Sequence, residues 1–365
     1  MIKIAQLAGQ AIYHDAVATM IKALNMLGLR VPTLEQTEAQ QQATAEELAL
    51  YQDNMKNHQI EALYHLPLMQ DETMKVCSRI IAIAIDSIVI GLPERLAFYT
   101  TKMVNMSIQH GLSPFTPVGY TFFAVILSGG FKDYTRAYKF SALASQLNQD
   151  KLINYAVRAK ISNTYAFFKL LREHLNVSAE YFRETYRIGV EGGDFVYAGY
   201  ALIEVTRYLL PVSLEEGIKA TQDAIAYCQK GNNMPMLLVA QMPAGFIKNL
   251  QGATLSQSTF NDSGFTEEAF INAFEKTAPV LFALYKRYKL QSLTLFNCYE
   301  QALPLVHERA TWIAAFGGLD LSLRSDYFLY AGVTIASLNT TAWYVDKTTD
   351  MAILGESMAE NQMML

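Results

Sequence analysis

The feature that most constrains the fold of this chain is a recurring phrase of helix, Gly-Gly turn and aromatic-rich helix. It occurs at 120–147 and 186–209, and in a looser form at 312–338. The glycine pairs recur at separations close to two and four units of roughly 31 to 34 residues, the length of a tetratricopeptide-type helix pair. Such a phrase predicts stacked helix pairs, an arrangement typical of scaffolds that hold partners. We expect structural turns at Gly129, Gly130, Gly192, Gly193, Gly317 and Gly318.

The composition is that of a folded chain and argues against several classes of function. Apolar residues make up 51% of the 365 residues and charged residues 17%, so a large core can be buried. The net charge is -5 and there is no run of Lys or Arg, so we expect no nucleic-acid binding. The most apolar stretch, at 80–93, is interrupted by Asp86 and is too short to span a bilayer. We therefore expect a buried helix there and no membrane insertion.

The start of the chain carries polar side chains where a signal peptide needs an apolar core, and we expect a cytoplasmic protein. Helical periodicity begins at once and predicts a first helix over 4–28. Thr44 and Glu47 have the spacing of a capping box and are expected to open the next helix. One polar loop, at 251–264, is either a binding loop or a simple connection.

Helices are expected along nearly the whole chain, and no β-strand alternation extends over more than a few residues. The predicted fold is all-α, a right-handed superhelical stack of antiparallel helix pairs, that is, a tetratricopeptide-like α-solenoid. We expect a single repeat domain over 1–345 and a frayed C-terminal tail over 346–365.

No motif for catalysis or nucleotide binding is present in the sequence. The chain lacks a GxxxxGK[ST] phosphate loop, kinase catalytic motifs, a GxSxG elbow and an HExxH zinc motif. His58 and His65 lie two helical turns apart, too far to ligate one metal ion without a third helix. The three cysteines are far apart and form no zinc or disulfide pattern. We therefore predict a protein that is not an enzyme and has neither metal nor cofactor.

Tyrosines are the strongest candidates for contact with a partner or ligand. Tyr197, Tyr200 and Tyr208 follow helical spacing and share one face of a helix. The interpretation we favour is a packing seam between neighbouring helix pairs. The alternative is a groove, in which an exposed stripe near Tyr99, Tyr197 and Tyr200 binds a partner or ligand, with the 251–264 loop at its rim.

Several phrases, in this order, carry a resemblance to a known family. They include ALNMLGLRVP at 23–32, EALYHLPLMQDETMKV at 61–76, TTKMVNMSIQHGLSP at 100–114 and GGDFVYAGYAL at 192–202. Across 20–340 the chain resembles the helical region of large bacterial multi-domain signalling proteins. Those proteins join a serine/threonine-kinase-like domain, a STAND-type ATPase, a tetratricopeptide-like helical region, a GAF sensor and a histidine kinase.

The resemblance implies a role for the helical region alone. Motifs of the kinase, ATPase, GAF and histidine-kinase domains are missing from the 365 residues, so no catalytic or nucleotide-binding residue carries over. In such proteins the helical region is expected to couple signal reception to neighbouring domains through protein contacts. The chain is then either a stand-alone descendant or a segment of a longer protein.

Two interpretations of function remain. The first is a non-enzymatic interaction or scaffold module in two-component signal transduction, with protein partners such as kinase or ATPase components acting in trans, and with self-association through an uncapped end. The second is a small-molecule sensor, or an unusual enzyme, with an aromatic-lined pocket. An enclosed cavity with converging polar groups, among them His58, His65 or His110, favours the second. An open groove without such groups favours the first.

Overall fold

The computed structural model describes residues 1–56, 58–170, 172–173, 177–210, 213–231, 233–308 and 330–336. These residues are mostly helical, as the periodicity predicts, and contain no β-strand; one isolated parallel bridge joins Leu68 and Leu112. The α-helices are α1 (Ile2–Gly9), α2 (Tyr13–Met26), α3 (Thr37–Met55), α4 (Glu72–Gly91), α5 (Leu96–His110), α6 (Thr116–Gly129), α7 (Tyr134–Asp150), α8 (Tyr155–Lys169), α9 (Ser178–Gly192), α10 (Phe195–Leu209), α11 (Leu214–Lys230), α12 (Met234–Leu250), α13 (Glu267–Phe274), α14 (Pro279–Leu295) and α15 (Tyr299–His307). Two 3-10 helices, η1 (Ile60–His65) and η2 (Pro93–Arg95), precede α4 and α5.

By their internal contacts, the described residues divide into two compact units. The first comprises Met1–Ala220, and the second begins at Thr221. Each unit is described by itself below. The single domain expected over 1–345 stays a prediction, and the tail expected over 346–365 lies outside the described residues.

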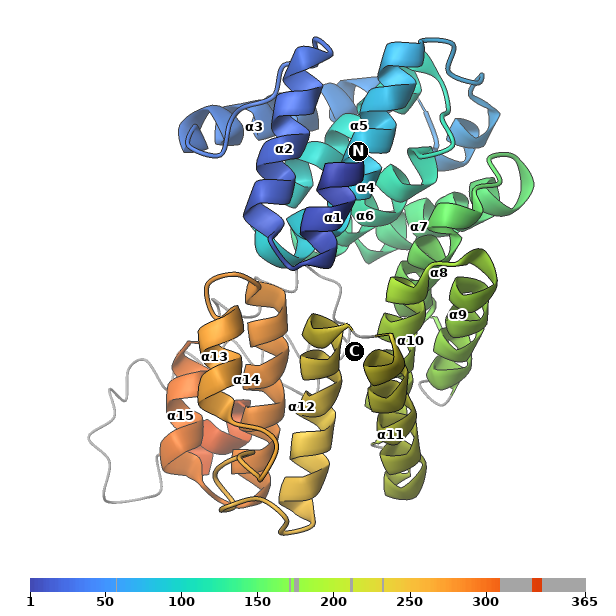
Figure 1. Cartoon of the computed structure of the whole chain (residues 1–365). Helices are drawn as coiled ribbons and strands as arrows, with labels where there is room; N and C mark the ends of the chain where they lie inside the picture. The colour runs from blue at the N-terminus through green and yellow to red at the C-terminus, as the bar shows by residue number, and fades with distance from the viewer. Residues whose placement is uncertain are drawn as a thin grey trace. The chain divides into compact units, whose positions relative to one another are not determined.

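Alternate helices of the first unit form a continuous row. α2 packs on α4, α4 on α6, α6 on α8, and α8 on α10 (Figure 1). From α4 to α10, each helix also packs against the next one along the chain. Contact with both the next helix and the next but one is what stacked helix pairs require. The all-helical packing of neighbours is confirmed, and the superhelical sense and repeat type stay predictions.

Aromatic rings fill the centre of this unit. The ring of Tyr51 lies 4.7 Å from that of Phe123, and Phe123 lies 5.2 Å from Phe140. Tyr120 is also fully buried, and its hydroxyl shares a hydrogen bond of 2.8 Å with Ser107. Fully burying one such side chain stabilises a fold by roughly 1.5–3 kcal/mol. Because the rings come from α3, α6 and α7, their burial joins helices that are distant in sequence.

Within the described residues, both Gly-Gly pairs lie where one helix ends and a short turn leads into the next helix. Between α9 and α10, Gly193 takes the left-handed conformation with φ 74°, and the side chain of Asp194 caps α10. Between α6 and α7, Lys132 takes that conformation with φ 55°, and Asp133 caps α7. In each turn the left-handed residue directly precedes the N-cap residue. The chain therefore reverses direction and begins the next helix within one short segment.

The other glycines of these pairs have different roles. Gly129 and Gly192 are the last residues of α6 and α9, and Gly130 follows α6 in right-handed conformation. A Cβ added at Gly192 would lie 3.1 Å from the carbonyl oxygen of Tyr155, so this turn lies against the start of α8. The third pair, at 317–318, lies outside the described residues.

Two further helix pairs use the same turn. Ala11 (φ 60°) directly precedes Ile12, the N-cap of α2, and Asn297 (φ 58°) directly precedes Cys298, the N-cap of α15. In both, the N-cap N–H donates to a carbonyl in the last turns of the preceding helix, at 2.9 and 2.8 Å. The left-handed Ala11 also explains why the helix predicted over 4–28 is two helices.

The capping box predicted at Thr44 and Glu47 is wrong. α3 begins at Thr37, so both residues lie inside it, and the Thr44 hydroxyl donates to the Gln40 carbonyl at 2.7 Å. Glu47 is 8% exposed and binds Nζ of Lys102, on α5, at 2.6 Å. A partner distant in sequence therefore uses the carboxylate that the pattern assigned to a helix start.

α14 is the central helix of the second unit. It packs against α12, α13 and α15. Leu290, Leu293 and Tyr330, each at most 1% exposed, belong to one apolar core there. Pro279 opens α14 after the short α13, a position where the missing N–H of proline does no harm.

Candidate functional site

The predicted tyrosine stripe is not an exposed surface. Tyr99 is 0% exposed, Tyr197 7% and Tyr208 9%, and Tyr200 is half-buried. The ring of Tyr208 stacks on Phe182 of α9 at 5.4 Å. The expectation of an open stripe is therefore wrong, because rings at these positions fill the space between neighbouring helices. The α10 tyrosines form a packing seam, the interpretation that the sequence favours.

Tyr197 belongs to a buried polar cluster that joins α4, α8 and α10. Its hydroxyl donates to Oδ1 of Asp86 at 2.7 Å, and Nζ of Lys160 binds Oδ2 of the same carboxylate at 2.8 Å. Nζ of Lys160 also lies 5.3 Å from the centroid of the Tyr197 ring. Lys160 is 7% exposed. A buried ion pair is tolerated when further hydrogen bonds satisfy its polar atoms, and here both carboxylate oxygens have a donor.

The cluster shifts the pKa values of the groups around it. Burial, and next the Asp86 carboxylate, raise the pKa of Tyr13 to about 12. The same two causes raise the pKa of Tyr197 well above its ordinary value. Burial also raises the pKa of Asp194, against the opposing effects of the hydrogen bond from the Tyr197 N–H and of the Lys160 charge. The hydroxyls of Tyr13 and Tyr197 therefore stay protonated near neutral pH, and that of Tyr197 remains a hydrogen-bond donor to Asp86.

Only one member of this cluster, Asp86, could be recognised from the sequence. Asp86 stands out as the charge that interrupts an apolar helix, and a charge in that setting requires a partner. Which of the 29 Lys and Arg residues supplies that partner is decided by tertiary packing. Lys160 was therefore missed.

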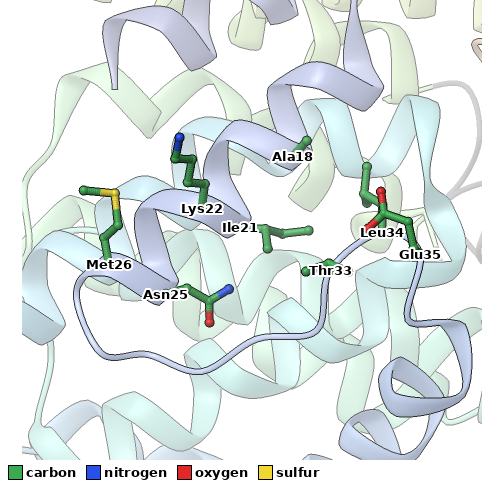
Figure 2. A pocket seen from close by; sticks show the side chains of 8 residues that line it. All are labelled: Ala18, Ile21, Lys22, Asn25, Met26, Thr33, Leu34 and Glu35. Atoms are coloured by element: carbon green, nitrogen blue, oxygen red, sulfur yellow. The ribbon is translucent and has the colours of Figure 1, made fainter.

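A groove of about 570 Å³ lies between α2 and the segment that follows it (Figure 2). Hydrogen bonds between two side chains and the backbone hold its outer wall in place. The Asn25 side chain donates to the Val31 carbonyl and accepts from the Val31 N–H, both at 3.0 Å. Arg95 donates to the carbonyls of Thr33 and Leu34 at 3.2 and 2.7 Å. The lining residues are Ala18, Ile21, Lys22, Asn25, Met26, Thr33, Leu34 and Glu35.

This groove does not have the features that would favour a sensor or enzyme. Most of its lining residues are exposed, so it opens to solvent, and none of its lining residues is a histidine. His58, His65 and His110 are all exposed. Within the described part of the chain, no group of three His, Cys, Asp or Glu residues is placed to hold a metal ion.

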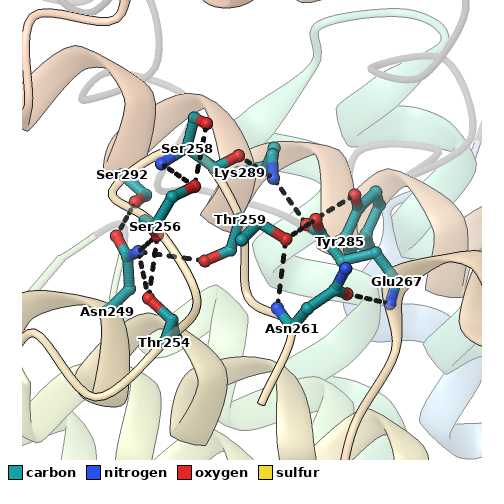
Figure 3. A network of polar contacts seen from close by, with 10 residues as sticks. All are labelled: Asn249, Thr254, Ser256, Ser258, Thr259, Asn261, Glu267, Tyr285, Lys289 and Ser292. Atoms are coloured by element: carbon teal, nitrogen blue, oxygen red, sulfur yellow. Dashed lines mark hydrogen bonds and ion pairs between the residues drawn. The ribbon is translucent and has the colours of Figure 1, made fainter.

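In the second unit, the polar loop at 251–264 is fastened at its base by Asn249, which is 1% exposed. Its Nδ2 donates to a threonine hydroxyl at 2.8 Å and to the carbonyls of Ser256 and Thr259, both at 3.0 Å (Figure 3). Its Oδ1 accepts from the hydroxyl of Ser292 on α14. One buried amide thus satisfies four polar groups.

Glu267, at the start of α13, fastens the other side of the loop (Figure 3). One carboxylate oxygen accepts from Nζ of Lys289 at 2.6 Å and from the Tyr285 hydroxyl at 2.9 Å, and the other accepts from the Thr259 hydroxyl at 2.6 Å. Lys289 also donates to the Ser258 carbonyl at 2.6 Å. Burial, and next the charge of Glu267, raise the pKa of Tyr285. These contacts favour a fixed connection over an open binding loop.

Comparison with known proteins gives one distant similarity. No protein-family model matches the chain, and no solved structure matches it. The chain is similar to hybrid signal transduction histidine kinase G of Dictyostelium discoideum, with 24% identity over 183 residues. That match covers 49% of this chain and 5% of the length of that protein. The similarity suggests a signalling context for part of the chain.

Among the helices that the structure describes, none is both long enough and apolar enough to cross a membrane.

Proposed function

We propose that this chain is a non-enzymatic protein-interaction module of a signal-transduction system, built as a tetratricopeptide-like solenoid in the cytoplasm. The observation that carries the proposal is the similarity to a signalling histidine kinase, in a chain whose helices pack in consecutive pairs. Stacked helix pairs present long surfaces to a peptide or a partner domain. The partners we propose are kinase or ATPase components acting in trans.

The polar clusters support a binding role over a catalytic one. The carboxylates of Asp86 and Glu267 each accept hydrogen bonds on both oxygens from groups of the same chain. Hydrogen bonds to the charged form stabilise a carboxylate and weaken it as a base, which supports a structural role for these two groups.

Affinity capture from cells of the source organism, with the full chain as bait and a tag-only bait as control, tests the proposal. We expect enrichment of sensor kinases, receiver proteins or ATPases on the full chain. An eluate that holds the chain alone with a co-purified small molecule would overturn the interaction module.

If the alternative function, a small-molecule sensor, holds for this chain, the groove beside α2 is where we expect a small apolar molecule to bind, between Ile21 and Leu34. Native mass spectrometry of the purified chain checks it. A bound mass that disappears in Ala18→Trp, a substitution of an exposed lining residue that narrows the groove, would support the sensor. Spectra free of any added mass in both proteins would rule it out for the purified chain.

A further inference from the structure

Three helices of the first unit have an aromatic residue at their first position or directly before it, at one edge of the helix row. Phe115 directly precedes α6, Tyr155 is the first residue of α8, and Phe195 is the first residue of α10. Phe115 is half-buried, and Tyr155 and Phe195 are each 61% exposed. We name this set the aromatic edge. Ile153 and Val196, next to it in sequence, are 56% and 42% exposed.

Contacts between backbone and side chains bring the three helix starts together. Nδ2 of Asn154 donates to the carbonyl of Pro114 at 3.2 Å, which joins the start of α8 to the start of α6. The backbone of Tyr155 lies against Gly192, in the turn that leads into α10. The edge is therefore one surface, formed by residues distant in sequence.

Three cations lie over aromatic rings along this surface. The guanidinium of Arg79 is 5.9 Å from the Phe115 ring, and that of Arg158 is 5.3 Å from the Tyr155 ring. Nζ of Lys151 is 5.5 Å from the ring of Tyr64, while it donates to the Tyr64 and Leu66 carbonyls at 2.9 and 3.0 Å. None of the three pairs with a carboxylate among the described residues.

Several other arginines of the same unit are paired with a carboxylate one helical turn away, namely Arg136, Arg183, Arg187 and Arg207. Arg172, over the ring of Tyr138 at 4.0 Å, is like the arginines of the edge and not like this set. The edge thus combines exposed rings with uncompensated positive charge, although the chain as a whole has a net charge of -5. Rings supply apolar contact area, and the guanidinium groups supply bidentate donors to carboxylates.

We propose that the aromatic edge binds an acidic, amphipathic segment of a protein partner. This inference rests on the proposed function, because it names the chemistry of the partner. Apolar side chains of the segment pack on Tyr155 and Phe195, and its carboxylates pair with Arg79 and Arg158. Cation–π contact holds both guanidinium groups in place before the partner arrives, which reduces the entropy lost on binding.

A titration followed by fluorescence anisotropy tests the pairing directly. The probe is a labelled amphipathic helical peptide with glutamates on one face and leucine and phenylalanine on the other. We expect the full chain to bind it, and the double variant Arg79→Glu, Arg158→Glu to bind it at least about tenfold more weakly. Arg183→Glu, which makes the same charge change at an exposed site on α9, should leave the affinity unchanged. Circular dichroism verifies that the variants remain folded.

Three outcomes would overturn the proposal. The first is that the chain binds a peptide in which every glutamate is lysine as tightly as it binds the acidic peptide. The second is that Arg183→Glu weakens binding as much as the double variant does. The third is that the chain binds phosphatidylserine vesicles but not the acidic peptide. Affinity capture with the double variant separates this inference from the proposed function. Signalling proteins captured by the unaltered chain and equally by the double variant would overturn the aromatic edge alone. Capture by neither protein would overturn both.

Discussion

The polar clusters of the two units use the same chemistry over very different sequence distances. In the first unit, Asp86 meets Lys160 and Tyr197 at sequence separations of 74 and 111 residues. In the second, Glu267 meets Thr259 and Lys289 at separations of 8 and 22 residues. The first cluster lies in an apolar helix row and joins α4 to α8 and α10. The second fixes a polar loop that has few apolar side chains to bury.

This difference separates two uses of a buried charge. Helices that already bury a large apolar face gain little stability from an ion pair, but they gain a constraint on their arrangement. A loop of small polar residues has no such face, so hydrogen bonds supply most of its order. Loss of the first cluster should therefore be felt across several helices, and loss of the second should remain local.

The largest effect is expected for Lys160→Met. It leaves the Asp86 carboxylate, whose side chain is 25% exposed, without its cation, which should lower the free energy of unfolding by about 2.5 kcal/mol. Urea unfolding followed by circular dichroism measures this. The matched control is Arg183→Met, which removes an exposed ion pair with Glu180 and should cost less than about 0.5 kcal/mol. Equal losses in the two variants would show that the cluster is no more than a surface-type ion pair.

Asn249→Asp should have the next largest effect. It replaces the amide that donates to Ser256 and Thr259 with a carboxylate that repels their carbonyls, at a cost of about 2 kcal/mol. Limited proteolysis and hydrogen exchange should show faster cleavage and exchange at 251–264, with the first unit unchanged. The control is Gln257→Glu, the same chemical change at an exposed position of the loop. Protection that is lost in the first unit as well would contradict a local role.

A smaller effect is expected from exchanging residues between the two matching turns. Gly193→Ala places a Cβ in the left-handed conformation and should lower the free energy of unfolding by about 1 kcal/mol. Lys132→Gly relieves the same conformation in the α6–α7 turn and should raise the free energy of unfolding by about 0.5 kcal/mol. This gain is smaller than the loss at Gly193 because glycine also increases the entropy of the unfolded chain, which opposes folding. Opposite shifts in urea midpoint would confirm that the turns are equivalent. Shifts of the same sign would show that they are not.

The smallest effect is a pH dependence of opposite sign in the two units. Burial raises the pKa of Asp194, so its favourable contribution is present below the unfolded pKa of about 3.9 and is lost as pH rises through the folded value. Partial burial alone would raise the pKa of Asp262, but Lys248 and the N–H groups of Gly264 and Phe265 lower it overall. The contribution of Asp262 is therefore present above about pH 3.9 and is lost as pH falls through the folded value.

Hydrogen exchange of each unit, measured from about pH 3 to pH 7, assigns these trends to their residues. Asp194→Asn keeps a capping oxygen and should remove the decline with rising pH in the first unit. Asp262→Asn should remove the decline with falling pH in the second. If either variant leaves its trend intact, a different group is responsible.

Local features of this molecule were predictable from sequence because they depend on nearby residues. The turns after α6 and α9 follow from the backbone preferences of the residues within them. Features that depend on distant partners were not predictable. Glu47 has the spacing of a capping residue, yet a lysine and an asparagine of α5 bind it. A buried aromatic stripe and an exposed one have the same spacing in the sequence. The burial of Tyr99 and Tyr197 could therefore be determined only from the packed helices.

The long sequence separation between Asp86 and its two partners has a consequence for synthesis on the ribosome. Tyr197 follows Asp86 by 111 residues, which takes roughly 6 to 20 seconds to translate at typical rates. During that interval the apolar stretch at 80–93 has been synthesised without Lys160 or Tyr197, the two residues that later bind its carboxylate. The Asp86 carboxyl group interrupts the apolar run, and a polar side chain at such a position disfavours intermolecular pairing of the nascent chain. One side chain thus limits association of the unfinished chain and later joins α4 to α8 and α10.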